Sequence, residues 1–233
     1  MKVLLDLLNS LDEESITSFG EFINSPYFNK RSDISRFFGL VSTKLPVAEL
    51  NRAEIYSLVY NQISINEQVV DNLFSRTKKL LLEFLTMQGI KNNDQARTNA
   101  LAFELAKRGM HKLTEKTIEK GFGRLENEFY TVDYLKKYYD YTELKESLAV
   151  SIRNFRQKTE NALHRGEAFV NYFILNLLRI ANDFIVFKYV NNVEEDNEIF
   201  NGFFKYFDFE KYIENLKMIN SPYYAITSVF YYG

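Results

Sequence analysis

Apolar side chains recur at steps of three and four residues along most of this chain, a spacing typical of α-helices that bury one face. Near the N-terminus, Ile16, Phe19, Phe22 and Ile23 follow this spacing. Only 3 of the 233 residues are prolines and 9 are glycines, whereas a β-sheet protein of this length needs many turn residues. The sequence therefore predicts an all-α protein.

A proline marks the end of the first long predicted helix. Pro26 pushes Ser25 out of the helical region, so the helix should stop there. Tyr27 and Phe28 follow directly. The same Ser-Pro-aromatic order returns at 221–224, where a new helix is expected to start. The motif is therefore interpreted as a structural boundary, and we expect the rings of Tyr27 and Phe28 to be buried against the first two helices.

A polar tract at 88–95 is expected to divide the chain into two domains, because it combines a glycine with consecutive asparagines. Before it, Asn51 and Asn66 are suited to cap helices, and residues 1–90 predict a compact helical N-terminal domain. After it, residues 91–233 predict helix after helix with short connections. This second part is expected to be a stack of antiparallel helical hairpins, an α-solenoid.

The most apolar predicted helix covers residues 167–189. Two shorter helices, 130–141 and 143–162, should precede it, with a turn at 165–166. Because the helix is apolar on nearly every face, we expect it to be buried on all sides in the middle of the stack. Its most apolar run, 168–178, is too short and too polar to span a bilayer, which takes about 20 apolar residues. The sequence thus predicts a soluble protein.

The C-terminal segment is apolar almost to the last residue. Val229 to Tyr232 contains no charged side chain, whereas a helical stack needs a polar outer cap to stay soluble. We therefore expect this chain to be truncated at its C-terminus, as part of a longer protein, or its end to dock on something else.

One segment follows the residue pattern of a known helical repeat. The matching residues are Leu101, Ala102, Leu105, Gly109, Thr114 and Gly121. At these positions the family pattern requires a large residue, a small residue or a glycine. By this match, residues 96–126 resemble a tetratricopeptide repeat, which is a pair of antiparallel helices. Glu126 stands where the family has proline, and the match fades one repeat later. The positions that depart from the pattern there are Lys136, Glu143 and Phe155.

This resemblance implies a right-handed stack that binds a protein or peptide on its concave face. When the contact positions of the family are placed on the matching positions of this sequence, the resemblance predicts six contact residues. They are Asn99, Phe103, Lys107, Asp133, Lys137 and Tyr141. A second resemblance concerns the run Phe22 to Asn29: it is similar to the start of certain uncharacterised bacterial proteins with a Ser-Pro-Tyr-Phe-Asn motif and a repeat-like helical body. That resemblance implies an architecture and no activity.

The chain offers no residue set for catalysis, for a metal or for a cofactor. It has no cysteine, which excludes thiol catalysis and cysteine–zinc sites. His164 has Glu160 and Glu167 nearby, but a di-iron bundle needs Glu-x-x-His on two helices, and surface ion pairs show the same spacing. The glycine pair Gly121 and Gly123 lacks the Lys-Ser/Thr of a phosphate-binding loop. We therefore predict a protein that is not an enzyme.

One alternative concerns DNA. Residues 51–85 have the outline of a helix-turn-helix, and this half loosely resembles winged-helix regulators fused to tetratricopeptide bodies. The cations of its second helix are Arg76, Lys78 and Lys79. Acidic residues near the start of that helix, Glu67 and Asp71, would repel phosphate.

The overall charge also argues against a nucleic-acid function. The formal net charge is −2, so no long-range field draws the chain to nucleic acid or to an anionic membrane. No secretory signal is recognised at the start. The sequence therefore predicts a cytoplasmic, non-enzymatic scaffold that binds a protein or peptide, with a DNA-binding regulator as the alternative. It does not indicate the partner or the oligomeric state.

Overall fold

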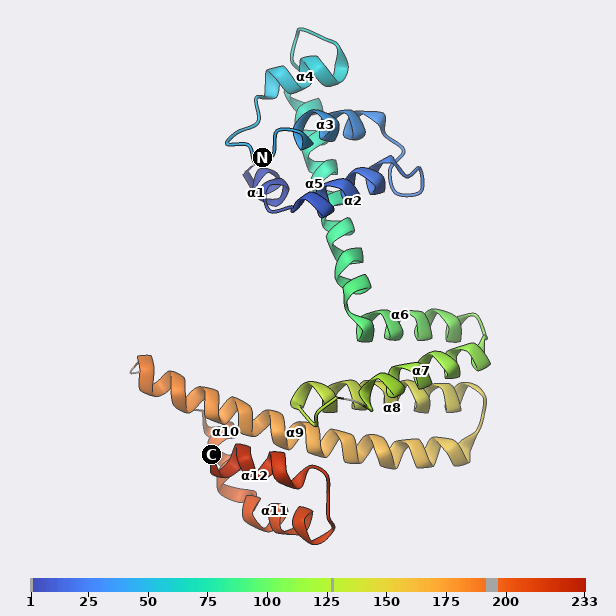
Figure 1. The fold of residues 1–233 in the computed structure, drawn as a ribbon, viewed down its shortest axis with the longest axis vertical. Coiled ribbons are helices and arrows are strands. Elements are labelled where there is room, and N and C mark those ends of the chain that lie inside the picture. The colour runs from blue at the N-terminus through green and yellow to red at the C-terminus, as the bar shows by residue number, and fades with distance from the viewer. Residues whose placement is uncertain (1, 127, 192–196) are drawn as a thin grey trace. The chain divides into compact units, whose positions relative to one another are not determined.

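The structure, a computed structural model, describes residues 2–126, 128–191 and 197–233. Over these residues it consists of twelve helices without a strand (Figure 1), so the all-α prediction is confirmed. The helices are α1 (Lys2–Asn9), α2 (Glu13–Asn24), α3 (Ser32–Ser42), α4 (Arg52–Tyr60), α5 (Glu67–Asn92), α6 (Asp94–Lys107), α7 (His111–Leu125), α8 (Val132–Ser151), α9 (Phe155–Asn191), α10 (Glu198–Tyr206), α11 (Phe209–Met218) and α12 (Tyr224–Tyr232). They form two compact units, unit 1 (Met1–Asn93) and unit 2 (Asp94–Gly233), which are described separately.

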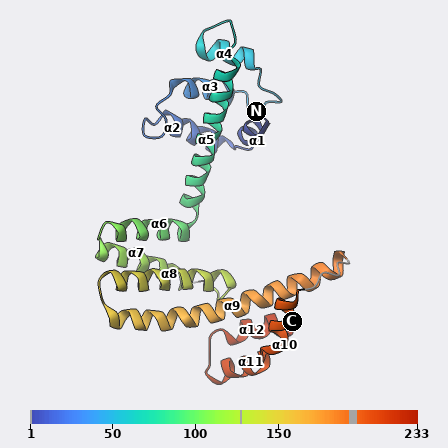
Figure 2. The same cartoon turned by 180° about the vertical axis from the view of Figure 1, so that it is seen from behind.

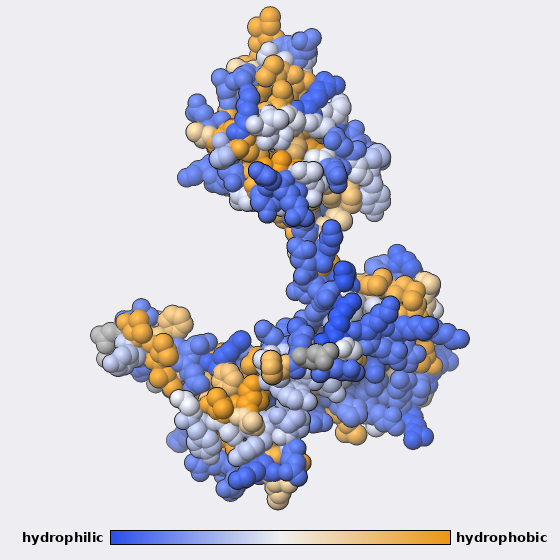
Figure 3. Space-filling view, viewed as in Figure 1, coloured by the Kyte–Doolittle hydropathy of each residue, from blue (hydrophilic) through white to orange (hydrophobic). Residues whose placement is uncertain are grey.

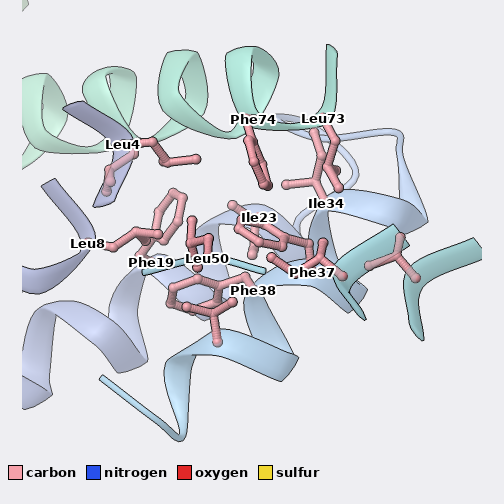
Figure 4. Close-up of a cluster of buried hydrophobic side chains, with 14 of the residues drawn as sticks. Leu4, Leu8, Phe19, Ile23, Ile34, Phe37, Phe38, Leu50, Leu73 and Phe74 are labelled. Carbon is pink, nitrogen blue, oxygen red and sulfur yellow. The ribbon is translucent and has the colours of Figure 1, made fainter. Parts of the chain in front are cut away.

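Helix α5 is the central element of unit 1, because it packs against α1, α2, α3 and α4. Its Leu73 and Phe74 meet apolar side chains of these helices in one cluster (Figure 4). The ring of Phe19 is completely buried there, and the ring of Phe38 approaches it edge-on with 4.8 Å between centroids. Edge-to-face contacts of this kind are favoured by the charge distribution of aromatic rings. Aromatic residues therefore fill the centre of unit 1.

The predicted N-caps of unit 1 are present. The side-chain oxygen of Asn51 accepts a hydrogen bond from the backbone N–H of Glu54 at 3.1 Å, and that of Asn66 accepts one from Val69 at 3.2 Å. Helix α5, however, continues through Gly89, so most of the predicted polar linker is helical. A glycine costs only about 1 kcal/mol relative to alanine inside a helix, which does not end a helix of 26 residues.

The Ser-Pro boundary falls where it was predicted, since α2 ends at Asn24 and Ser25 is extended. The ring of Phe28 is half-buried and stacks on Phe22, with 4.1 Å between centroids. The predicted burial of Tyr27 is wrong, because 85% of this residue is exposed. Phe28 takes the place on Phe22, and Tyr27 meets only the edge of the Phe28 ring.

Unit 2 begins with helices that reverse direction one after another (Figure 2). The turn between α6 and α7 contains Gly109 with a φ of +71°, a conformation that glycine adopts without strain. Helix α7 packs on α8, α8 packs on α9, and α6 also contacts α8. Near the C-terminus, α11 packs on α12, and α12 packs on α9. A Cβ atom on Gly121 would lie 2.8 Å from the ring of Tyr141, so α7 and α8 approach closely there.

The predicted helices 130–141 and 143–162 are wrong. One helix, α8, spans the first of them, and the turn follows it at Arg153, which has a φ of +56°. Helix α9 then runs for 37 residues through Gly166, where a turn was predicted. The side chain of Arg165 pairs with two glutamates of α8 at this point, and these pairs tie this part of α9 to its neighbour.

Candidate protein-docking surface

One side of α9 is buried, and the opposite side is exposed. Helices α8 and α12 pack closely against α9. Leu175 is buried in a cluster with residues of α8, and Ile174 and Leu178 are buried in a cluster with Phe209 of α11. Seven residues follow the exposed side, and we call them the α9 stripe. They are Phe169, Phe173, Asn176, Ile180, Asp183, Phe187 and Val190. The prediction that residues 167–189 are buried on all sides is therefore wrong, because the large apolar side chains of the stripe are 39–70% exposed.

The α9 stripe has the spacing of a coiled-coil seam. Its residues lie at alternating steps of four and three, which keeps them on one side of a helix over three heptads. The exposed fraction is 39–50% for Phe169, Phe173 and Ile180, and it reaches 64% for Phe187 and 70% for Val190 at the end of the helix. In a coiled coil, the side chains at these positions are covered by a partner helix.

Helix α10 lines one edge of the stripe. The ring of its Phe203 meets Phe173 with 5.3 Å between centroids, and its Phe200 meets Phe184 with 6.3 Å. Every residue of α10 is described, and none is fully buried. A groove of about 220 Å³ runs between the two helices. Its lining residues are Ile180, Phe184, Asn197, Phe200 and Asn201.

The α9 stripe and this groove together form the surface that we call the docking surface. Figure 3 shows apolar residues gathered toward the end of α9. Ile185, Val186 and Tyr189 in the same stretch are also exposed, Tyr189 by 90%. Apolar surface of this extent is uncommon on monomeric soluble proteins and is typical of interaction sites.

Two opposite charges lie near the middle of the docking surface. The guanidinium of Arg179 donates to the side-chain oxygen of Asn176 at 2.9 Å. The carboxylate of Asp183 forms no hydrogen bond or ion pair with any residue that the structure describes. Both side chains are exposed, and by helical spacing Arg179 lies on the side of the stripe away from Phe184. Charged groups are thus available at an otherwise apolar surface.

The segment of α9 from Arg156 to Asn191 is also long and apolar enough to cross a membrane, by length and composition alone. The apolar run 168–178, interpreted from the sequence as too short to span a bilayer, belongs to this longer segment. Only 22% of its most apolar window is buried within the protein, so the helix differs from the core helix of a soluble domain.

The structure places three of the predicted contact residues on one side of α6. Phe103 is 64% exposed, Lys107 is exposed, and Asn99 is half-buried with a side-chain oxygen that has no hydrogen-bond partner in the described part of the chain. On α8, Asp133 is exposed, whereas the ammonium of Lys137 pairs with Glu128 at 2.8 Å.

The prediction for Tyr141 is wrong. Only 2% of this residue is exposed, and its ring lies in the core with Ile118 and Leu125. The reason is that Gly121 lets α8 come close enough to insert the ring. Sequence reasoning missed the α9 stripe, although its four-three spacing is visible in the sequence, because the helix was interpreted as apolar on every face.

The outline of a helix-turn-helix at 51–85 is occupied by α4 and α5. The guanidinium of Arg52 lies between the carboxylates of Glu67 and Asp71, at 2.6 and 2.8 Å. The start of α5 is thus held to α4 by an ion-pair cluster. Further along α5, residues between Val70 and Phe84 are buried in the centre of unit 1.

A buried carboxylate in unit 1 is held by two hydrogen-bonding partners. Asp33 is 8% exposed and accepts hydrogen bonds from Arg31 and from the hydroxyl of Tyr60, the latter at 2.8 Å. The bond from Arg31, followed by the bond from Tyr60, holds the pKa of Asp33 below its ordinary value against the effect of burial. Burial and the nearby carboxylate raise the pKa of Tyr60 to about 12. All three groups are paired, so this cluster stabilises the fold and offers no free reactive group.

Comparison with models of protein families, with curated proteins and with solved structures gave no match. The tetratricopeptide resemblance of residues 96–126 therefore stays a prediction. In the described part of the chain, no three metal-ligating side chains come together, and His164 is exposed.

Proposed function

We propose that this protein is a non-enzymatic helical scaffold that binds a protein partner through the docking surface of α9 and α10. The observation that carries the proposal is the α9 stripe, a seam with coiled-coil spacing in which five of seven residues are exposed apolar side chains, beside a groove. Large apolar side chains left in water favour association, because each one that is covered removes apolar area from water. The cytoplasmic location expected from the sequence belongs to the same proposal.

The arrangement of α6, α7 and α8 supports the view that the start of unit 2 is tetratricopeptide-like. A glycine turns α6 into α7, a small residue of α7 meets α8, and α6 contacts α8. The side of α6 with Asn99, Phe103 and Lys107 is then a second contact face, to which a peptide would bind. No observation favours the DNA-binding alternative, because Glu67 and Asp71 lie where a recognition helix would approach phosphate.

A photo-crosslinker tests the proposal directly. p-Benzoyl-phenylalanine replaces Phe187 in the full chain, which is expressed in its native host and irradiated. We expect adducts to protein from position 187. The matched control places the same group at Lys112, an exposed residue of α7 outside the docking surface, where we expect few adducts. If position 187 gives no more protein adduct than position 112, the proposal is wrong.

A further inference from the structure

We propose that the partner of the docking surface is a second copy of this chain, with the two α9 helices antiparallel and their stripes in contact. This inference rests on the proposed function, because it names the partner of the same surface. It requires that the stripe be complementary to itself when one copy is turned end to end, as the two-fold symmetry of a dimer demands.

The order of residues along the α9 stripe meets this requirement. In an antiparallel pair centred between Ile180 and Asp183, Phe173 of one copy lies opposite the partner's Val190. Phe187 likewise lies opposite the partner's Asn176. Each end of the paired stretch thus places a phenylalanine against a smaller side chain, which is how facing positions fill a helical seam without overpacking. At the centre, Ile180 lies opposite the partner's Asp183. This centring places no described residue opposite Phe169.

The two charges are arranged in the same self-complementary way. Arg179 and Asp183 lie on either side of the centre of the pair, so the guanidinium of each copy comes beside the carboxylate of the other. Asp183 has no partner among the described residues of its own chain. Opposite charges at corresponding positions fix the register of a helical pair, because a shifted or parallel pairing would separate them or bring like charges together.

The exposed apolar residues supply about half of the area that a standard dimer interface buries per partner. A large aromatic side chain offers roughly 150–250 Å². The apolar stripe residues inside the paired stretch therefore expose roughly 400 Å². They are Phe173, Ile180, Phe187 and Val190. The charged and polar side chains around them raise the surface toward the ~800 Å² per partner of a standard interface. The groove between α9 and α10 provides a further site for partner side chains.

The same charges disfavour a lipid surface as the occupant. Arg179 and Asp183 interrupt the apolar segment, and a charged side chain is unfavourable in the hydrocarbon core of a bilayer. Asn176 adds a further polar group. In a pair of chains, these groups meet each other instead of hydrocarbon. The stripe therefore suits a second copy better than a membrane.

Charge reversal followed by mixing tests the proposal. In R179D, each chain carries carboxylates at both positions, and in D183R each chain carries guanidinium groups at both. Either variant alone brings like charges together in the dimer. In a 1:1 mixture, every carboxylate meets a guanidinium of the other chain. The dimer dissociation constant of the full chain is measured by sedimentation equilibrium up to about 200 µM, where interfaces of micromolar affinity are populated.

We expect each variant alone to dissociate at least about tenfold more readily than the wild-type chain, and the mixture to recover wild-type affinity to within about threefold. Circular dichroism of each variant checks that the helices are intact. The control K112E changes a charge outside the docking surface and should leave the dissociation constant unchanged.

A wild-type chain that stays monomeric throughout the concentration range overturns the proposal, as does a mixture that associates no better than its components. The photo-crosslinker at position 187 separates the two proposals. Adducts only to other proteins leave the scaffold function standing and reject the dimer. Absence of protein adducts rejects both, and adducts of twice the chain mass support both.

Discussion

The core of unit 1 and the α9–α10 region of unit 2 use aromatic residues in opposite ways. In unit 1, α5 passes among four other helices, and rings such as that of Phe19 are completely buried. Around α9, helices pack on one side, and the phenylalanines of the stripe remain in water. Spacing at three and four residues is common to both regions. The difference lies in how many neighbouring helices the chain supplies, which the pattern of one helix does not determine.

The largest expected effect concerns the buried rings of unit 1. Phe19→Ala removes a ring with no exposed surface and leaves a cavity, so it should lower the stability of unit 1 by about 3–5 kcal/mol. Hydrogen exchange of the α5 amides, followed by mass spectrometry, measures this loss. Phe187→Ala is the matched change in α9 and should alter α9 exchange by no more than about 0.5 kcal/mol in the monomer. A similar loss at both sites would remove the contrast between the two regions.

The buried aspartate of unit 1 and the exposed aspartate of α9 should differ in their contribution to stability. Asp33 is buried and bonded to Arg31 and Tyr60, so Asp33→Asn should lower the stability of unit 1 by about 1.5–3 kcal/mol at pH 7. Its pKa is depressed by folding, so its contribution is present above the unfolded pKa of about 3.9 and is lost as the pH falls through the lower folded value. The difference between variant and wild type should therefore shrink on acidification, as thermal unfolding at several pH values will show.

Asp183→Asn is the control for that experiment. The carboxylate of Asp183 is exposed and has no partner among the described residues, so in the monomer the substitution should change stability little at any pH. A pH-dependent loss for Asp183→Asn in dilute solution would mean that this carboxylate is paired within its own chain. That result would also weaken the argument for pairing between copies.

A smaller effect is expected where α7 meets α8. This contact is tightly packed although it belongs to unit 2, so the contrast with unit 1 applies to α9 and α10 only. Gly121→Ala places a methyl group 2.8 Å from the Tyr141 ring and should cost about 1–3 kcal/mol through overpacking. Gly123→Ala is the control two residues further on, where no described atom lies within 4 Å of the added group. It should stabilise α7 by about 0.5–1 kcal/mol. Thermal unfolding of both variants measures the difference, and equal effects would contradict the close approach.

Local rules predicted much of this fold from the sequence. The caps at Asn51 and Asn66 and the end of α2 at Ser25 depend on neighbouring residues only, and all three are observed. The continuity of α5 through Gly89 and of α9 through Gly166 was not predicted, because the packing of a long helix outweighs the small cost of one glycine.

The candidate site was harder to predict, because exposure depends on tertiary packing. The helical spacing that includes Tyr141 fits a contact face and a buried core equally well. Tyr141 is buried because α7 approaches α8 closely at Gly121. The α9 stripe was hidden by the apolar residues on its other sides, such as Leu175 and Leu178. The packing of α8, α11 and α12 distinguishes the buried side from the exposed one. The sequence predicts contact residues on α6 and α8, whereas the docking surface that we propose lies on α9 and α10.

The smallest expected effect lies within unit 1, at the two rings that follow the Ser-Pro boundary. Tyr27 is 85% exposed, so Tyr27→Ser should change the stability of unit 1 by at most about 0.5 kcal/mol. Phe28 stacks on Phe22, and Phe28→Ser should cost about 1–2 kcal/mol through the loss of that contact and of buried area. Hydrogen exchange of the α2 amides measures both. Equal losses would mean that Tyr27 packs as tightly as Phe28. If Tyr27→Ser has no effect, unit 1 also carries an exposed aromatic ring that adds nothing to stability. The contrast with α9 then depends on whether neighbouring residues cover each ring, and not on the unit to which the ring belongs.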